Sequence, residues 1–144
     1  MNLSPHFTLE ELTHSEIAVR KGIANTPDAD TVENLKVLAS SLERVRHVLG
    51  SPIIVSSGYR SPKVNSTVGG SPTSSHLFGY AADFICPGFG TPREICEAIR
   101  ASGIDYDQII EEGTWVHFSA DPRMRRIALQ AKFSGGKASY APLT

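Results

Sequence analysis

Three residues far apart in the chain, His76, Asp83 and His117, place the strongest constraint on how this sequence can fold. His76 and Asp83 are seven positions apart, a spacing too long for one face of a strand. A loop residue and a strand residue can still meet if Gly79 permits a turn, and a neighbouring strand can bring His117 to the same point. Two imidazoles and one carboxylate can bind one divalent metal ion and leave a fourth position open for water, as in catalytic zinc sites. The fold must therefore join one loop and two strands around these donors.

This donor set suits zinc, although manganese and iron are chemically conceivable. Each residue taken singly has a simpler explanation, since a histidine on a strand is more often a hydrogen-bonded polar residue than a ligand. Asp83, after Ala81-Ala82, could simply end a strand. The three residues coincide, however, with a Gly/Ser-rich loop and a Trp115-Val116-His117 strand. We therefore predict a metal site.

A hydrolytic metal site also needs a general base, and two glutamates precede His117 at a turn. Glu111 and Glu112 lie six and five positions before His117. Adjacent residues of an extended chain point in opposite directions, so we expect only one of them to face the site. Glu112, next to Gly113 at the bend, is favoured, and Glu111 is the alternative. The competing explanation is that Glu111 and Glu112 are simply solvent-exposed residues of a turn with no catalytic role.

Apolar residues at spacings of three and four predict an amphipathic helix over residues 30–49, ended by Gly50. Thr91 and Pro92 predict a second helix, because threonine is a good N-cap and proline is favoured at the first helical position. Residues 58–75 are rich in Gly, Ser, Pro and Asn and predict a long loop of the kind that often carries function. Short β-branched segments predict strands at residues 52–57, 80–85, 106–110 and 114–119, the last two forming a hairpin.

The length of 144 residues fits one domain, with a core over residues 3–130 and a loosely held tail at 133–144. A net charge of −1 and a pI near 6.5 argue against a nucleic-acid binder, and no apolar run is long enough for membrane insertion. The N-terminal residues lack the pattern of a signal peptide, so cytoplasmic synthesis is expected. Cys86 and Cys96 are expected to be unpaired thiols.

Several short motifs surround the candidate donors: Ser57-Gly58-Tyr59-Arg60-Ser61, Asn65, Gly69-Gly70, Ser74-x-His76-x-x-Gly79-x-Ala81-x-Asp83, Gln108-Ile109-Ile110 and Trp115-Val116-His117. With these motifs the chain resembles the zinc D-alanyl-D-alanine carboxypeptidase family, the M15 peptidases, and especially its small phage and bacterial members. The opening residues 3–12 are also similar, so the resemblance covers residues 3–120. Together with the predicted elements it implies an α+β fold, with a small central antiparallel sheet flanked by helices, as in D,D-peptidases and the hedgehog signalling domain.

The resemblance implies a zinc-dependent peptidase that hydrolyses peptide bonds in peptidoglycan stem peptides, with one zinc ion on His76, Asp83 and His117. We expect the chain to be a monomer. In that mechanism zinc-bound water attacks the peptide carbonyl while a glutamate acts as general base. Arg60 then matches an arginine that stabilises the carbonyl oxygen or binds a substrate carboxylate. A surface arginine in a turn is the plainer explanation for Arg60.

Ser74 matches a serine that hydrogen-bonds the substrate peptide, although a turn hydroxyl explains it almost as well. Tyr59 and Gln108 are expected to line the cleft, with packing as an equal alternative. Several family members place the catalytic acid three residues before the last zinc histidine, where this chain has Thr114. The base must then come from the hairpin turn, which supports Glu112.

Three functions compete at this point. The first is a cell-wall hydrolase, either a D,D-carboxypeptidase or an endolysin-type endopeptidase released to the wall by a holin-type or other partner. The second is a non-catalytic phage structural or binding module that retains the metal site. The third is a zinc peptidase for small D-amino-acid dipeptides.

Overall fold

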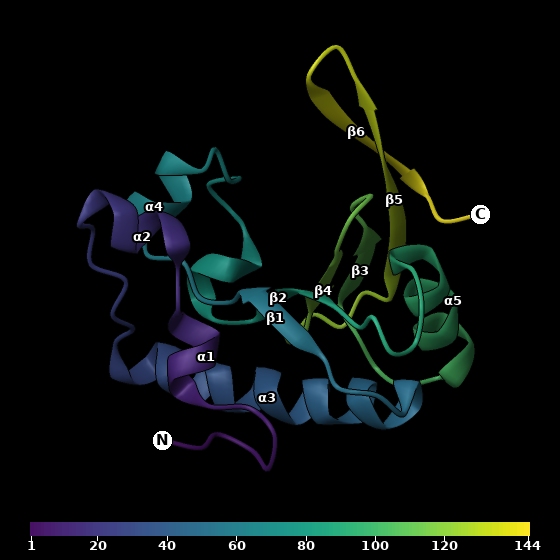
Figure 1. The fold of residues 1–144 in the computed structure, drawn as a ribbon, viewed down its shortest axis with the longest axis horizontal. Coiled ribbons are helices and arrows are strands. Elements are labelled where there is room, and N and C mark those ends of the chain that lie inside the picture. The colour runs from purple at the N-terminus through teal and green to yellow at the C-terminus, as the bar shows by residue number, and fades with distance from the viewer.

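One sheet of six strands organises the fold, in the order β1-β2-β4-β3-β5-β6 (Figure 1). The computed structural model describes all 144 residues. Neighbouring strands are antiparallel except β3 and β5, which run parallel. The α+β class is confirmed, but the expected antiparallel sheet is wrong because the sheet is mixed. The strands are β1 (Ile54–Ser57), β2 (Ala81–Ile85), β3 (Gln108–Glu111), β4 (Val116–Ser119), β5 (Ile127–Ser134) and β6 (Lys137–Pro142).

The parallel pair follows from the way the chain returns after the β3–β4 hairpin. Ser119 at the end of β4 lies opposite Gln108 at the start of β3. A short loop then carries the chain past that end of β3, and β5 begins with Ile127 opposite Gln108 on the other side. A strand that starts at the same end as β3 must run in the same direction. Only this long-range arrangement makes the sheet mixed.

The longest helix, α3 (Ala29–Leu49), begins one residue before the predicted start. Asp28 caps it, because its side chain accepts a 2.8 Å hydrogen bond from the amide of Thr31. Gly50 ends the helix in the left-handed conformation, with a φ of 64°. The buried face carries apolar side chains at the predicted helical spacing: Leu35, Leu38, Leu42, Val45 and Leu49.

Helix α5 (Pro92–Ser102) packs beside α3 on the same face of the sheet (Figure 1). Its capping box is complete, since Thr91 and Glu94 each accept a hydrogen bond from the other's backbone amide. Between the helices and the strands lies the main core. Fully buried side chains fill it from both layers, including Leu38, Leu42, Ile95, Ile99, Phe84 and Phe118.

The remaining helices are short and lie at the other end of the sheet (Figure 1). The segment predicted as a long loop contains α4 (Pro62–Thr67) and ends in a 3-10 turn, η1 (Ser75–Phe78). Helices α1 (Leu9–Thr13) and α2 (Glu16–Lys21) precede α3. None of the helices combines the length and the apolar character that a membrane crossing requires.

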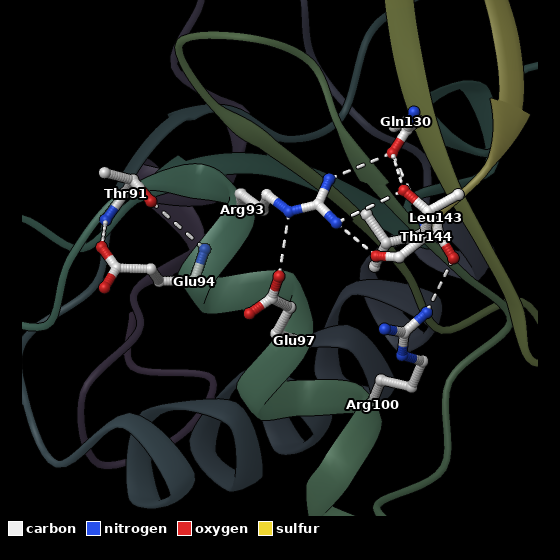
Figure 2. Close-up of polar contacts among 8 residues, drawn as sticks. All are labelled: Thr91, Arg93, Glu94, Glu97, Arg100, Gln130, Leu143 and Thr144. Atoms are coloured by element: carbon white, nitrogen blue, oxygen red, sulfur yellow. Dashed lines mark hydrogen bonds and ion pairs between the residues drawn. The ribbon is translucent and has the colours of Figure 1, made fainter.

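Strands β5 and β6 form a hairpin that extends beyond the body of the molecule (Figure 1). The sequence predicts neither strand, and residues 133–144, expected to be loosely held, supply the turn and the second strand. The chain end after β6 contacts α5 (Figure 2). Arg93 donates to Gln130 at 3.1 Å and to the Thr144 carbonyl, and Arg100 donates to the Leu143 carbonyl at 2.9 Å. Leu143 is itself buried in the core.

Candidate metal centre and its cavity

Asp83 and His117 are brought together by the register of two adjacent strands. They are directly opposite each other on β2 and β4. Their chain neighbours Ala82, Phe84 and Phe118 are fully buried and face the helices. Because side chains alternate along a strand, Asp83 and His117 point to the opposite face of the sheet. This face carries the candidate site.

His76 reaches the same point from the 3-10 turn η1, as predicted from the spacing around Gly79. Gly79 ends the turn with a φ of 78°, the left-handed conformation that glycine adopts readily. The His76 ring is almost fully buried, and its Nδ1 lies 2.7 Å from the Gly58 carbonyl oxygen. A carbonyl can only accept, so Nδ1 carries the proton and Nε2 keeps its lone pair for a ligand. The backbone at Gly58 therefore fixes the tautomer of His76.

The three donor atoms have the separations that one small cation requires. Asp83 Oδ1 lies 3.2 Å from His76 Nε2 and 3.2 Å from His117 Nδ1. Ligands about 2.0–2.1 Å from a tetrahedral zinc ion are themselves about 3.3 Å apart. All three donor atoms lie within 4.8 Å of one another. The residues present thus fit one divalent ion such as zinc.

The protonation states of the donors also suit a metal ligand set. Burial lowers the pKa of His76, which favours the neutral imidazole. Burial alone would raise the pKa of Asp83, but the two neighbouring histidines outweigh it and hold the pKa of that carboxyl well below its usual range. A neutral imidazole and an ionised carboxylate are the forms that bind metal.

Arg60 lies beside the donors and is oriented by Ser74. Its amide donates to the His76 carbonyl at 3.0 Å, and its Nη2 donates to Ser74 Oγ at 3.2 Å. The same Ser74 oxygen accepts from the His76 amide at 3.2 Å, so Ser74 is a turn hydroxyl as well as a cavity residue. Arg60 Nε is buried without a partner. A buried unpaired donor is costly, and a ligand in the cavity would satisfy it.

The two glutamates of the hairpin turn lie on opposite faces of the sheet. Glu112 lines the cavity with the donor residues, and burial raises its pKa. Glu111 pairs with the buried Val116 on the face of the sheet that packs against α5, where its charge helps raise the pKa of Cys96. Only Glu112 is therefore in place to act on a group bound at the donors.

The cavity has a volume of about 550 Å³, enough for a short peptide. Gln108 lines it, as expected. Tyr59 does not: its side chain is buried in the core, so the packing alternative is correct for this residue. Tyr59 directly precedes Arg60, but only Arg60 lines the cavity.

One wall of the cavity is the loop between α4 and η1, and Asn65 holds it in place. Asn65 Nδ2 donates to the Ser71 carbonyl at 2.9 Å, and the Gly70 amide donates to the Asn65 carbonyl at 2.8 Å. A Cβ on Gly70 would lie only 2.1 Å from Asn65 Oδ1. A side chain at position 70 would therefore force Asn65 to shift from its present position against the loop.

Three cavity residues come from the part of the chain that sequence reasoning did not assign to the site: Arg123, Arg125 and Tyr140. Arg123 and Arg125 follow β4, and Tyr140 lies on β6 close enough to Glu112 for each to shift the other's pKa. The only available signal was the cluster Arg123-Met124-Arg125-Arg126 in a chain of nearly balanced charge. Nothing in the sequence points to Tyr140.

Comparison with known proteins agrees with this geometry. A sequence model described as peptidase M15 matches residues 5–119. A stretch of 51 residues is 45% identical to the zinc D-Ala-D-Ala carboxypeptidase of Streptomyces albus G. That match covers 35% of this chain and 20% of the relative, so it spans about a fifth of the relative's length.

Proposed function

Because this chain belongs to the peptidase M15 family, we propose that it is a zinc-dependent metallopeptidase that hydrolyses peptide bonds in peptidoglycan stem peptides. The observation that carries this proposal is the meeting of the three donors with Glu112 in one cavity. The name of the Streptomyces albus G relative supports both zinc and a stem-peptide substrate.

In this proposal His76, Asp83 and His117 hold the zinc ion. When bound, zinc supplies Lewis-acid polarisation of the substrate carbonyl and of a water molecule. Glu112 takes the proton of the attacking water and delivers it to the leaving amine. Its raised pKa supports this role, because a base works best when its pKa approaches the working pH.

Arg60 contributes the positive charge that the developing oxyanion needs. Its Nη2 is held by Ser74, and its unpartnered Nε faces no competing protein acceptor. A guanidinium offers parallel donors, so Arg60 is also suited to bind a substrate carboxylate. Replacing Arg60 with lysine separates these roles, since loss of oxyanion stabilisation lowers kcat whereas loss of substrate binding raises KM.

The test compares two matched variants, Glu112→Gln and Glu111→Gln. Each removes one carboxylate from the same turn, and only Glu112 lines the cavity. We expect Glu112→Gln to lower kcat by about 10²–10⁴-fold while zinc remains bound at one ion per chain. Glu111→Gln should keep nearly full turnover.

If both variants behave like the unmodified protein, Glu112 is not the base. If zinc-loaded protein leaves stem peptides intact, the alternative function, a non-catalytic phage structural or binding module, replaces the enzyme.

The finer assignment is a D,D-carboxypeptidase or an endolysin-type endopeptidase acting on the cell wall of a phage host. Mass spectrometry of digested muropeptides decides between them, because a carboxypeptidase releases one terminal residue and an endopeptidase releases a fragment. We also infer that the scaffold is that of the D,D-peptidases and the hedgehog signalling domain, which rests on analogy of fold.

A further inference from the structure

The cavity has a second polar end, away from the catalytic glutamate. Ile110 lies opposite His117, and Gln108 lies two residues earlier on the same strand. Two residues of a strand span about 7 Å, so Gln108 lies about that far along the sheet from the metal ligands. Arg123 and Arg125 line the cavity together with Gln108. Glu112 lies at the opposite end, beyond Ile110.

Arg125 is fixed by a fully buried carboxylate. Its Nε and Nη2 each donate to Asp107 at 2.8 Å, and its amide donates to the same side chain at 3.0 Å. Asp107 has no exposed surface, whereas the Arg125 side chain is 35% exposed. The Nη1 group of Arg125 has no protein partner. The two hydrogen bonds to buried Asp107 therefore hold the Nε–Nη2 edge of the guanidinium and leave Nη1 free to donate to a ligand.

Arg123 repeats this arrangement nearer the surface. Its Nε and Nη2 donate to the two carboxylate oxygens of Asp121, each at 3.0 Å. Its Nη1 also has no protein partner. The backbone between and after the two arginines is strained, since Met124 and Arg126 have φ values of 43° and 57°. Such conformations cost roughly 1–3 kcal/mol each and are often found where a site is pre-organised.

We propose that Arg123 and Arg125 form a carboxylate-binding subsite that recognises a carboxylate of the stem peptide at this end of the cavity. The subsite rests on the proposed function and adds a determinant of substrate choice to it. Two guanidinium edges held in fixed positions match the two oxygens of a carboxylate. Gln108 provides a further polar contact beside them.

The charges of the two arginines and their two aspartate partners determine what kind of anion the subsite can bind. Asp107 and Asp121 already offset the charges of Arg125 and Arg123. Free anions are therefore not expected to accumulate here. Instead, a carboxylate carried by a bound peptide accepts hydrogen bonds from the free edges, and an amide in its place accepts them more weakly. The recognised carboxylate is either the C-terminal one or that of an internal acidic residue.

The experiment measures peptide binding by calorimetry in zinc-loaded protein carrying Glu112→Gln, so that the peptide is not cleaved. Arg123→Gln is the main variant because its partner Asp121 is partly exposed, whereas Asp107 is fully buried. Arg125→Lys is the second variant, since lysine keeps a positive charge beside Asp107 but lacks the guanidinium edge that is free to bind a carboxylate. Arg126→Gln is the control: Arg126 stacks on Tyr106, with its guanidinium carbon 5.0 Å from the ring centre, and does not line the cavity.

Each variant is titrated with a stem peptide bearing free carboxylates, with the same peptide amidated at its C-terminus, and with one amidated at the internal acid. We expect Arg123→Gln and Arg125→Lys to weaken binding of the free-acid peptide about tenfold, or about 1.4 kcal/mol, and Arg126→Gln to leave it unchanged. The amidated peptide that no longer responds to the variants identifies the recognised carboxylate.

An unchanged dissociation constant for Arg123→Gln overturns the subsite, even if Arg125→Lys fails to fold. Cleavage by the unmodified protein is scored separately. Cleavage together with unchanged binding in the variants refutes the subsite alone. Absence of cleavage together with weakened binding in the variants refutes the peptidase and retains the subsite.

Discussion

Replacing Gly58 with alanine tests whether the backbone before Arg60 orients His76, one of the three proposed metal ligands. A Cβ at position 58 would lie 2.3 Å from the Leu12 carbonyl oxygen, whereas ordinary contact begins at 3.4 Å. Both contacting groups belong to the backbone, so no flexible side chain can move aside. The two segments must therefore separate by about 1 Å.

We expect that separation to disrupt the contact that orients His76. The Gly58 carbonyl oxygen lies 2.7 Å from His76 Nδ1, and a shift of this size takes the pair beyond hydrogen-bond range. Loss of such a partner behind a metal-bound histidine typically weakens metal affinity by about 10–100-fold. This range corresponds to about 1.4–2.8 kcal/mol of binding free energy.

The assay is a competition titration with a chromophoric zinc chelator. Gly103→Ala is the control, because it also adds one methyl group to a glycine, but Gly103, at the end of α5 with a φ of 79°, has no atom near its missing Cβ. We expect the control to lose about 1 kcal/mol of stability and to keep its zinc affinity. If Gly58→Ala folds and binds zinc as tightly as the unmodified protein, the Gly58 carbonyl does not orient His76.

Three further predictions concern titratable groups. Burial alone would raise the pKa of Asp107, but hydrogen bonds from Arg125 outweigh it and hold that pKa below its ordinary value. The stabilisation is therefore present above about pH 4 and is lost as the pH falls through the folded-state pKa. Urea unfolding of Asp107→Asn should accordingly depend less on pH in this acid range, and an equally steep dependence would contradict the assignment. Burial raises the pKa of Glu112 and the Tyr140 hydroxyl lowers it, so Tyr140→Phe should move the acid limb of the kcat/KM profile to higher pH; an unmoved limb would show that Tyr140 does not act on this carboxyl. Burial raises the pKa of Cys96 to about 12, so its thiol should resist alkylation in the folded protein and react after unfolding, which mass spectrometry of alkylated samples measures.

The directions in which the three candidate metal donors point were predictable from the sequence because local rules determine them. Alternation along β2 and β4 sets the directions of Asp83 and His117, and Gly79 marks the turn that brings in His76. The choice between Glu111 and Glu112 was harder, since it depends on the side of a bend to which each side chain turns. The register of Glu111 with Val116 turns Glu111 away from the donors and so supports Glu112, and register is a property of the paired strands.

The contribution of the last third of the chain was not predictable in the same way. Strand β5 pairs with β3 only because the loop after β4 crosses the end of the sheet. Strand β6 is largely exposed and has little apolar alternation to reveal it. Tyr140 and the two cavity arginines reach the site through these long-range pairings. A sequence motif describes one continuous segment, so it does not show which distant segments pair with it in the sheet.

The position of Asp107 has a consequence for how this protein can change its substrate. Asp107 joins three strands, since its amide donates to the Ser119 carbonyl and its carbonyl accepts from the Ile127 amide, both at 2.9 Å. The residue whose side chain anchors Arg125 is thus, through its backbone, part of the junction between these strands. Altering Arg125 changes recognition and structural integrity at once, whereas the partner of Arg123, Asp121, is partly exposed. Evolution or engineering of a new specificity is therefore expected to proceed through position 123 first, with position 125 retained as part of the framework.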